Sequence, residues 1–185
     1  MEKYVVSARK YRPTKFDDVI GQNHVTTTLK NAIKNNKVAQ SLLFCGPRGV
    51  GKTTCARILA NEINGFNIND PLDSSNNLNI YELDAASNNS VDDIRSLIDQ
   101  VRYAPQAGKY KVYIIDEVHM LSNAAFNAFL KTLEEPPSYA IFILATTEKN
   151  KVIPTILSRC QIYDFNRIEI PDIKSKLINL SLIHI

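Results

Sequence analysis

Short apolar runs alternate along the chain with stretches in which apolar residues recur every three or four positions. The apolar runs predict strands at Ser41–Cys45, Asn79–Leu83, Lys111–Asp116, Tyr139–Ala145 and, more briefly, Tyr163–Phe165. The helical spacing predicts helices at Thr53–Ile63, Val91–Val101, Asn123–Leu133 and Asp172–Leu180. This alternation is typical of βαβ units, so we expect an α/β domain built around a parallel sheet.

Local signals support several of these boundaries. Ser90 is a suitable N-cap for the second helix, and Asp92 and Asp93 lie in its first turn, where acids favour the helix dipole. Pro136 and Pro137 end the third helix. The polar, Asn-rich stretch Gly65–Asn79 predicts a loop.

Composition narrows the class only a little. A chain of 185 residues with 44% hydrophobic and 22% charged residues is typical of a globular protein, and a net charge of +3 does not establish a nucleic-acid partner. Residues 1–40 hold eight Lys or Arg against three acids, whereas residues 70–100 hold seven acids against Arg95 alone. This asymmetry fits either faces for different partners or an ordinary solvated surface.

Targeting signals and metal motifs are not apparent. The N-terminus lacks the apolar core of a secretory signal, and no stretch approaches the ~18 apolar residues that span a bilayer. We therefore expect a cytoplasmic protein without a membrane partner. Cys45, Cys55 and Cys160 match no zinc or disulfide spacing, so we expect them to be thiols.

A Gly-rich segment between the first strand and the first helix carries the clearest chemical signal. It fits G-x-x-x-x-G-K-[ST], in which backbone N–H groups surround phosphates at a helix N-terminus. We expect Lys52 to reach the β- and γ-phosphates of ATP and Thr53 to complete the shell of Mg²⁺. The segment's predicted nucleotide contacts are Gly46, Pro47, Arg48, Gly49, Val50, Gly51, Lys52, Thr53 and Thr54.

Asp116 is the last residue of the strand KVYIID, and Glu117 follows it. A carboxylate at the C-terminal end of a parallel strand, beside the phosphate loop, is placed to hold Mg²⁺ directly or through water. We assign that role to Asp116 and a general-base role toward the attacking water to Glu117.

Two further segments leave alternatives open. Thr146 and Thr147 follow the strand YAIFILA, where a hydroxyl could bind the γ-phosphate or the attacking water, or simply cap a turn. Arg159 could be a solvated or salt-bridged side chain, or an arginine finger supplied to a neighbour's nucleotide.

Taken together, the motifs resemble the gamma/tau family of bacterial DNA polymerase III subunits, which are AAA+ ATPases of the sliding-clamp loader. The resemblance covers roughly residues 4–170. It rests on RKYRP at 9–13, FDDVIGQ at 16–22, GPRGVGKTT at 46–54, ELDAASNNSVDDIR at 82–95, YIIDEVHMLS at 113–122, AFNAFLKTLEEPP at 125–137, ILATTE at 143–148 and ILSRCQ at 156–161.

The resemblance implies a five-stranded parallel sheet of the AAA+ type over residues 1–168, followed at 169–185 by the start of a helical lid. It implies that Thr147 is the first sensor residue and that Arg159 reaches the ATP of a neighbouring subunit. It also places the adenine against Tyr11, Arg12, Pro13, Val19, Ile20 and Gln22. For Val19 and Ile20, packing around an N-terminal helix is the alternative.

Two departures from the family pattern matter. The four cysteines that usually hold a structural zinc are absent from Gly65–Asn79, so we expect no zinc. The chain also stops where the lid should begin, and Ser181–Ile185 continues no recognisable pattern, so we expect a truncated chain.

The implied function is an ATP-hydrolysing motor subunit of the clamp loader, acting in DNA replication. Its partners would be the delta and delta prime subunits, further gamma/tau copies, the sliding clamp and primer–template DNA. The chain has no paired-Asp site for polymerase chemistry. Rival interpretations are a Holliday-junction branch-migration AAA+ helicase, a non-hydrolysing scaffold subunit of the clamp loader and a small-molecule P-loop kinase.

Overall fold

Five strands and the helices between them follow the predicted alternation. The computed structural model describes residues 11–66, 79–106 and 108–183. Its helices are η1 (Phe16–Asp18), α2 (Asn23–Lys34), α3 (Lys52–Asn64), α5 (Val91–Val101), η2 (Val118–Met120), α6 (Asn123–Glu134), η3 (Lys149–Lys151), α7 (Pro154–Leu157) and α8 (Ile170–Ile183). Its strands are β1 (Ser41–Cys45), β2 (Ile80–Asp84), β3 (Lys111–Asp116), β4 (Ala140–Thr146) and β5 (Gln161–Asp164).

The strands form one sheet in the order β2-β3-β4-β1-β5, and every neighbouring pair is parallel. The expected five-stranded parallel sheet is therefore confirmed. Because the strands are parallel, all their carboxyl ends lie at one edge of the sheet. Ligands of open α/β sheets bind at that edge, where the strand order reverses.

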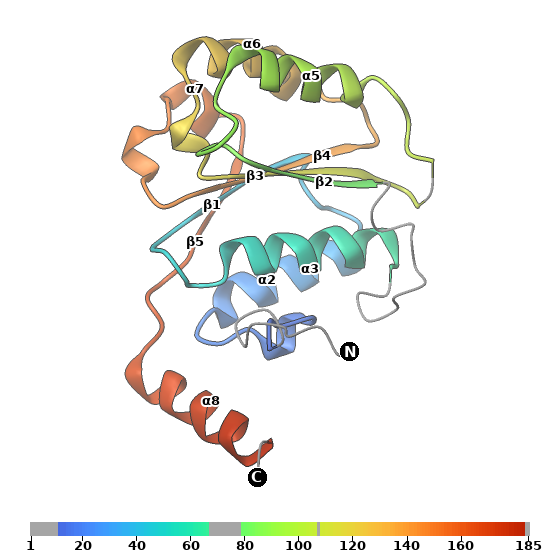
Figure 1. Ribbon diagram of the computed structural model, residues 1–185. Coiled ribbons are helices and arrows are strands. Elements are labelled where there is room, and N and C mark those ends of the chain that lie inside the picture. Colours follow the sequence, from blue (N-terminus) through green and yellow to red (C-terminus); the bar gives the residue numbers. More distant parts are fainter. Residues whose placement is uncertain (1–10, 67–78, 107, 184–185) are drawn as a thin grey trace, which may run out of the picture.

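Helices cover both faces of the sheet (Figure 1). α5, α6 and α7 lie over one face, and α2 and α3 lie over the other. α8, at the C-terminal end, extends beyond the α2–α3 layer. Parallel sheets need this double cover because side chains on both faces of their strands are apolar.

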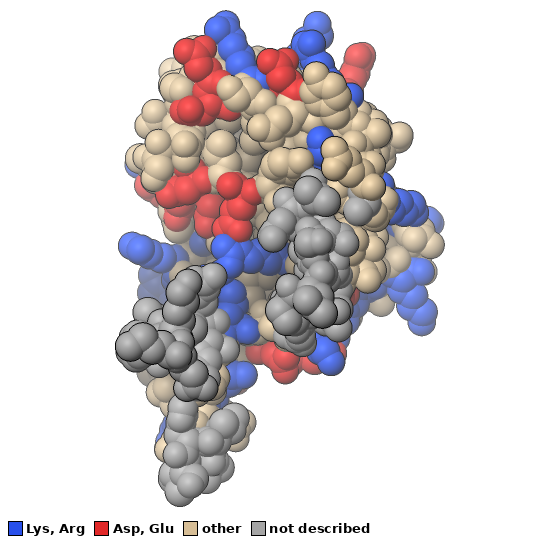
Figure 2. Space-filling view, turned by 45° about the vertical axis from the view of Figure 1, so that its right-hand side comes forward, with Lys and Arg blue, Asp and Glu red and all other residues tan. Residues whose placement is uncertain are grey.

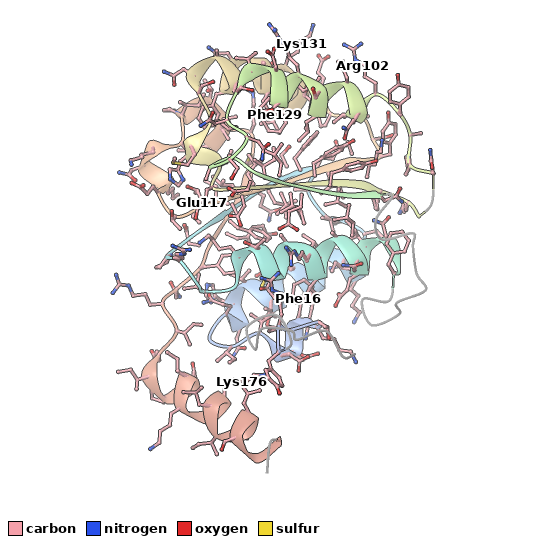
Figure 3. All side chains as sticks on the ribbon, viewed as in Figure 1. Phe16, Arg102, Glu117, Phe129, Lys131 and Lys176 are labelled. Carbon is pink, nitrogen blue, oxygen red and sulfur yellow. The ribbon has the colours of Figure 1, made fainter. Side chains whose placement is uncertain are left out.

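The apolar side chains form two cores, one on each face of the sheet. Successive strand residues alternate between the faces, so Leu42 and Phe44 belong to the α2–α3 core and Leu43 to the α5–α6 core. Figure 3 shows Phe129 between α6 and the sheet. Its ring meets that of Phe142 edge-on, with centroids 5.3 Å apart.

The predicted cap of α5 is present in full. The Ser90 hydroxyl accepts a hydrogen bond from the Asp93 backbone N–H at 3.2 Å, and the Asp93 carboxylate accepts one from the Ser90 backbone N–H at 3.1 Å. This reciprocal capping box satisfies two N–H groups that the helix leaves unpaired.

Some boundaries were wrong, and α2 was not predicted. β5 begins two residues earlier than expected and ends before Phe165, because it is an edge strand in which Tyr163 alone is fully buried. The predicted helix over Asp172–Leu180 is α8, which is longer at both ends. The sequence contains no clear signal for α2, because the Gln22 side chain does not cap its N-terminus and threonines interrupt its apolar stripe.

Two predictions concern segments that the structure describes only in part. Residues 67–78 of the loop Gly65–Asn79 lie outside the described residues, as do residues 9 and 10 of the motif at 9–13. In the part of the chain that is described, no helix has the length and apolarity needed to cross a membrane.

Replacing Phe129 by Ala should lower the free energy of unfolding by about 3–5 kcal/mol, because it removes a fully buried ring and leaves a cavity against Phe142. Chemical denaturation followed by circular dichroism measures the change. Tyr103→Ala, at a side chain that is 71% exposed, is the matched control and should change stability by less than about 0.5 kcal/mol. Equal midpoints for the two variants would contradict the assignment of Phe129 to the core.

Candidate functional site

The Gly-rich loop joins β1 to α3 at the carboxyl edge of the sheet. Gly46 has a φ of 153°, and a Cβ on it would lie 2.5 Å from the carbonyl oxygen of Phe165. Only glycine fits this close approach of the loop to the segment that follows β5. Gly51, at φ 101°, is the N-cap of α3, so the loop's backbone N–H groups and the helix N-terminus face the same space.

Lys52 lies inside the loop. Its side chain is buried, and Nζ donates hydrogen bonds of 2.7 Å to the carbonyl oxygens of Gly46 and Pro47. Burial lowers the pKa of Lys52, while the nearby Glu117 and Asp116 carboxylates raise it. The ammonium is therefore placed beside two acids at the point where the loop would surround phosphates.

Thr53 and Asp116 meet across the gap between α3 and β3. The Thr53 hydroxyl donates to Asp116 Oδ2 at 2.6 Å, and Asp116 Oδ1 accepts the Glu117 backbone N–H at 2.9 Å. Hydroxyl and carboxylate oxygens are the ligands that Mg²⁺ takes in proteins, together with water and substrate phosphates. This donor pair fits the predicted metal role.

Glu117 turns back toward β4. Its backbone is left-handed, with φ 48° and ψ 45°, which is uncommon for a residue other than glycine. Its Oε2 accepts hydrogen bonds from the Thr147 hydroxyl at 2.9 Å and from the Thr147 backbone N–H at 3.2 Å. The structure thus brings together the two residues that were predicted to handle the attacking water.

These groups line one cavity of about 700 Å³. The space is large enough for a nucleotide, because ligand cavities typically measure ~300–1,000 Å³. Its lining combines three cationic side chains with hydroxyls and carboxylates, which come mainly from the carboxyl ends of four strands and the segments that follow them. The lining residues are Arg12, Arg48, Gly49, Gly51, Lys52, Thr53, Thr54, Asp84, Ala86, Asp116, Glu117 and Thr147.

A smaller cavity of about 190 Å³ adjoins the phosphate loop and has a largely apolar wall. Pro13, Val19 and Ile20 line it together with Val50 and Ile168. Val19 also belongs to the α2–α3 core, so packing and a contact with a bound base are compatible at that residue. An apolar wall of this kind is typical of sites that hold the ring of a bound ligand.

Tyr11 and Gln22 line neither of these two cavities. Gln22 is completely buried: its amide donates to the Asn166 carbonyl at 2.7 Å and accepts the Asn166 backbone N–H at 3.1 Å. Its side chain joins the start of α2 to the segment between β5 and α8. A contact of Gln22 with the nucleotide stays a prediction.

Arg159 also lies away from the cavity of its own chain. Its guanidinium is paired with the Glu134 carboxylate at the end of α6 and donates to the Thr155 carbonyl at 2.6 Å. The salt-bridged alternative therefore describes this arginine within one chain. An action on a neighbouring chain stays a prediction.

Two residues at or near the cavity, Asp84 and His119, were not assigned a role from the sequence. Asp84 ends β2 in register with Asp116 of β3, and a carboxylate just after a predicted strand was a usable signal. His119 was missed because its approach to Glu117 depends on a turn after β3 that no sequence pattern reveals. Its Nδ1 lies 3.0 Å from the Thr146 hydroxyl and 3.4 Å from Glu117 Oε2.

Among residues 11–66, 79–106 and 108–183, no group of three or more His, Cys, Asp or Glu side chains could hold a metal ion alone. This result is compatible with the Thr53–Asp116 pair, because Mg²⁺ is usually held by one or two protein groups with waters and substrate phosphates.

Charges of both signs lie close together on the molecule. Figure 2 shows a group of Asp and Glu side chains directly above a group of Lys and Arg side chains at its left edge. Because this face carries charges of both signs, the view does not show whether the uneven charge along the sequence marks faces for different partners or an ordinary solvated surface.

The parallel sheet, the phosphate loop and the carboxylates at the end of β3 define a P-loop protein of the AAA+ class. A family model described as "DNA polymerase III, delta subunit" matches residues 21–169, so the chain belongs to that family. The expected kinship with gamma/tau subunits is confirmed by curated relatives. The chain is 52% identical to the DNA polymerase III subunit tau of Bacillus subtilis over 178 residues, and 45% identical to that of Escherichia coli over 185.

The chain covers only part of these relatives. The match to the B. subtilis protein takes in 89% of this chain and 31% of that protein, and the match to the E. coli protein 94% and 29%. Among solved structures, a DNA polymerase III gamma subunit-related protein of Thermotoga maritima has a TM-score of 0.62 and 26% identity, covering 76% of this chain and 46% of that one. The T. maritima RuvB Holliday junction branch migration motor has a TM-score of 0.67 and 24% identity, covering 89% and 52%, which shows a shared fold alone.

Gln22→Ala should lower the free energy of unfolding by about 1–3 kcal/mol, because it leaves the Asn166 backbone N–H and carbonyl without their buried partner. Urea titration measures the loss. Gln161→Ala, at an exposed side chain of β5, is the control and should change stability by less than about 0.5 kcal/mol. A Gln22 variant with the wild-type midpoint would contradict a stabilising link.

Proposed function

We propose that the chain is the ATP-hydrolysing motor part of a clamp-loader subunit of DNA polymerase III, covering the AAA+ domain over residues 1–168 and the start of a helical lid at 169–185. The observation that carries the proposal is the convergence of Lys52, Thr53, Asp116, Glu117 and Thr147 on one 700 Å³ cavity. The tau and gamma names of the relatives support the place of the chain in that assembly.

The residues divide the work of phosphoryl transfer to water. Lys52 and the loop N–H groups hold the β- and γ-phosphates, which fixes the substrate and balances its charge. Thr53 and Asp116 would hold Mg²⁺, which supplies further neutralisation of phosphate charge when bound. Glu117 accepts a proton from the attacking water, and Thr147 keeps the carboxylate in place.

The base of ATP is proposed to lie in the adjoining apolar cavity of Pro13, Val19 and Ile20, with Arg12 at the edge of the larger cavity. Tyr11 and Gln22 remain proposed contacts, although neither lines these two cavities. In this arrangement the γ-phosphate would lie near Lys52 and Glu117.

In the assembly, ATP-bound subunits would hold the sliding clamp open and grip primer–template DNA, and hydrolysis would release the clamp. Proposed partners are the delta and delta prime subunits and further gamma/tau copies. DNA contacts would be mainly to phosphates and therefore salt-dependent and insensitive to sequence. Such a protein would act in the cytoplasm.

Two substitutions separate binding from hydrolysis. Lys52→Ala should abolish both nucleotide binding and turnover, whereas Glu117→Gln should keep ATP bound and slow hydrolysis by about 10²–10⁴-fold, the usual contribution of a general base. Fluorescent-nucleotide titration and phosphate release measure the two effects. Lys131→Ala, at an exposed lysine of α6, is the control and should behave as wild type. The site assignment is wrong if Lys52→Ala binds and hydrolyses ATP normally.

Arg159 should act only between subunits. In a DNA-bound assembly, Arg159→Ala should lower turnover by about 10³–10⁵-fold if it stabilises transition-state charge as arginine fingers do. The chain alone should hydrolyse ATP slowly, and the substitution should leave that slow rate and ATP affinity unchanged. A variant assembly that turns over ATP at the wild-type rate would exclude the finger role.

A further inference from the structure

His119 is a buried imidazole beside the proposed general base, and the proposed mechanism does not use it. It lies in η2, the short turn that follows Glu117, and its side chain is only 5% exposed. The turn is closed by a 2.8 Å hydrogen bond from the Met120 backbone N–H to the Glu117 carbonyl. This turn brings the ring back against the carboxyl end of β4.

Both ring nitrogens contact groups that surround the site. Nδ1 lies 3.0 Å from the Thr146 hydroxyl and 3.4 Å from Glu117 Oε2, and Nε2 lies 3.4 Å from Glu148 Oε1. The Thr146 hydroxyl also accepts the Glu148 backbone N–H at 3.0 Å. The imidazole therefore connects the turn after β3 with the turn after β4.

These contacts fall on one oxygen of Glu117. Oε2 accepts hydrogen bonds from the Thr147 hydroxyl and the Thr147 backbone N–H. His119 Nδ1, which is hydrogen-bonded to the Thr146 hydroxyl, lies 3.4 Å from the same oxygen. No residue in the described part of the chain forms a hydrogen bond with Oε1. A carboxylate held by one oxygen presents the other in a defined direction, and Glu117 lines the 700 Å³ cavity.

We infer that His119 is a positioning residue for ATP hydrolysis, which holds Glu117 through Nδ1 so that the free carboxylate oxygen faces the attacking water. The inference rests on the proposed general-base role of Glu117. His119 touches neither water nor nucleotide in this arrangement. Its effect is on the orientation of the base, and small misplacements of reacting groups are costly in rate.

Two near-isosteres separate this role from simple packing. The amide nitrogen of Asn lies about where Nδ1 of His lies, and that of Gln about where Nε2 lies. Asn at position 119 would keep the contact toward Thr146 and Glu117, whereas Gln would keep only the contact toward Glu148. If His119 only filled space, the hydrolysis rates of the two variants would not depend on which ring nitrogen the new amide replaces.

The experiment compares His119→Ala, His119→Asn and His119→Gln in the whole chain, with Glu117→Gln in parallel. ATP affinity, the rate of single-turnover hydrolysis and the thermal midpoint are measured for each. His24→Ala is the matched control: its ring lies at the start of α2, where Nε2 is 2.9 Å from the Asp164 carbonyl, and it does not line the cavity.

The expected result is that His119→Ala and His119→Gln slow hydrolysis by about 10–100-fold, a part of the ~10²–10⁴ that a general base supplies. His119→Asn should stay within about threefold of wild type, and all variants should bind ATP with wild-type Kd. If the Ala variant does not fold, the difference in hydrolysis rate between the Asn and Gln variants still tests the inference.

Two results would overturn the inference while leaving the proposed function intact: a His119→Ala variant as fast as wild type beside an inactive Glu117→Gln, or equal rates for Asn and Gln. If Glu117→Gln itself hydrolyses ATP at the wild-type rate, the general-base assignment fails and the role of His119 fails with it.

Discussion

Strand β1 is buried along its whole length between β4 and β5, and the phosphate loop begins where this strand ends. The Gly46 backbone N–H donates to the Thr146 carbonyl at 3.2 Å, which joins the loop directly to the end of β4. Since β3 is the next strand beyond β4, Asp116 and Glu117 lie on the same edge. The site thus depends on a sheet order that sets β1 beside β4 rather than beside the strands next to it in sequence.

The segment after β5 is held against the same loop from two directions. Phe165 packs so closely on Gly46 that no side chain fits between them, and Asn166 is bound on both backbone groups by Gln22. The chain that leads to α8 therefore begins in contact with the phosphate loop. A shift of the backbone at Gly46 should therefore also shift the backbone at Asn166, and the reverse, because packed contacts leave little room for independent movement.

Much of the fold follows from apolar patterning, because strands such as Lys111–Asp116 are both strongly apolar and sharply bounded. The phosphate loop could be predicted because its residue spacing is itself the chemical requirement, and the acids at the end of β3 because they end a clearly apolar strand. The pairing of Gln22 with Asn166 could not be predicted, because Asn166 is remote in sequence and meets Gln22 only after folding. The contacts of Glu117 with Thr147 and His119 depend likewise on strand register and on a left-handed turn.

Several hydrogen bonds hold Glu117 in this left-handed turn. A left-handed backbone at a non-glycine residue costs roughly 1–2 kcal/mol, and such conformations persist only where surrounding contacts over-determine them. Asp116 Oδ1 accepts the Glu117 backbone N–H, Met120 binds its carbonyl, and Thr147 binds its carboxylate. Asp116 and Thr147 line the cavity with Glu117, so two of the groups that offset the backbone strain also hold this side chain at the site. Stability and orientation at Glu117 are therefore set by the same few hydrogen bonds.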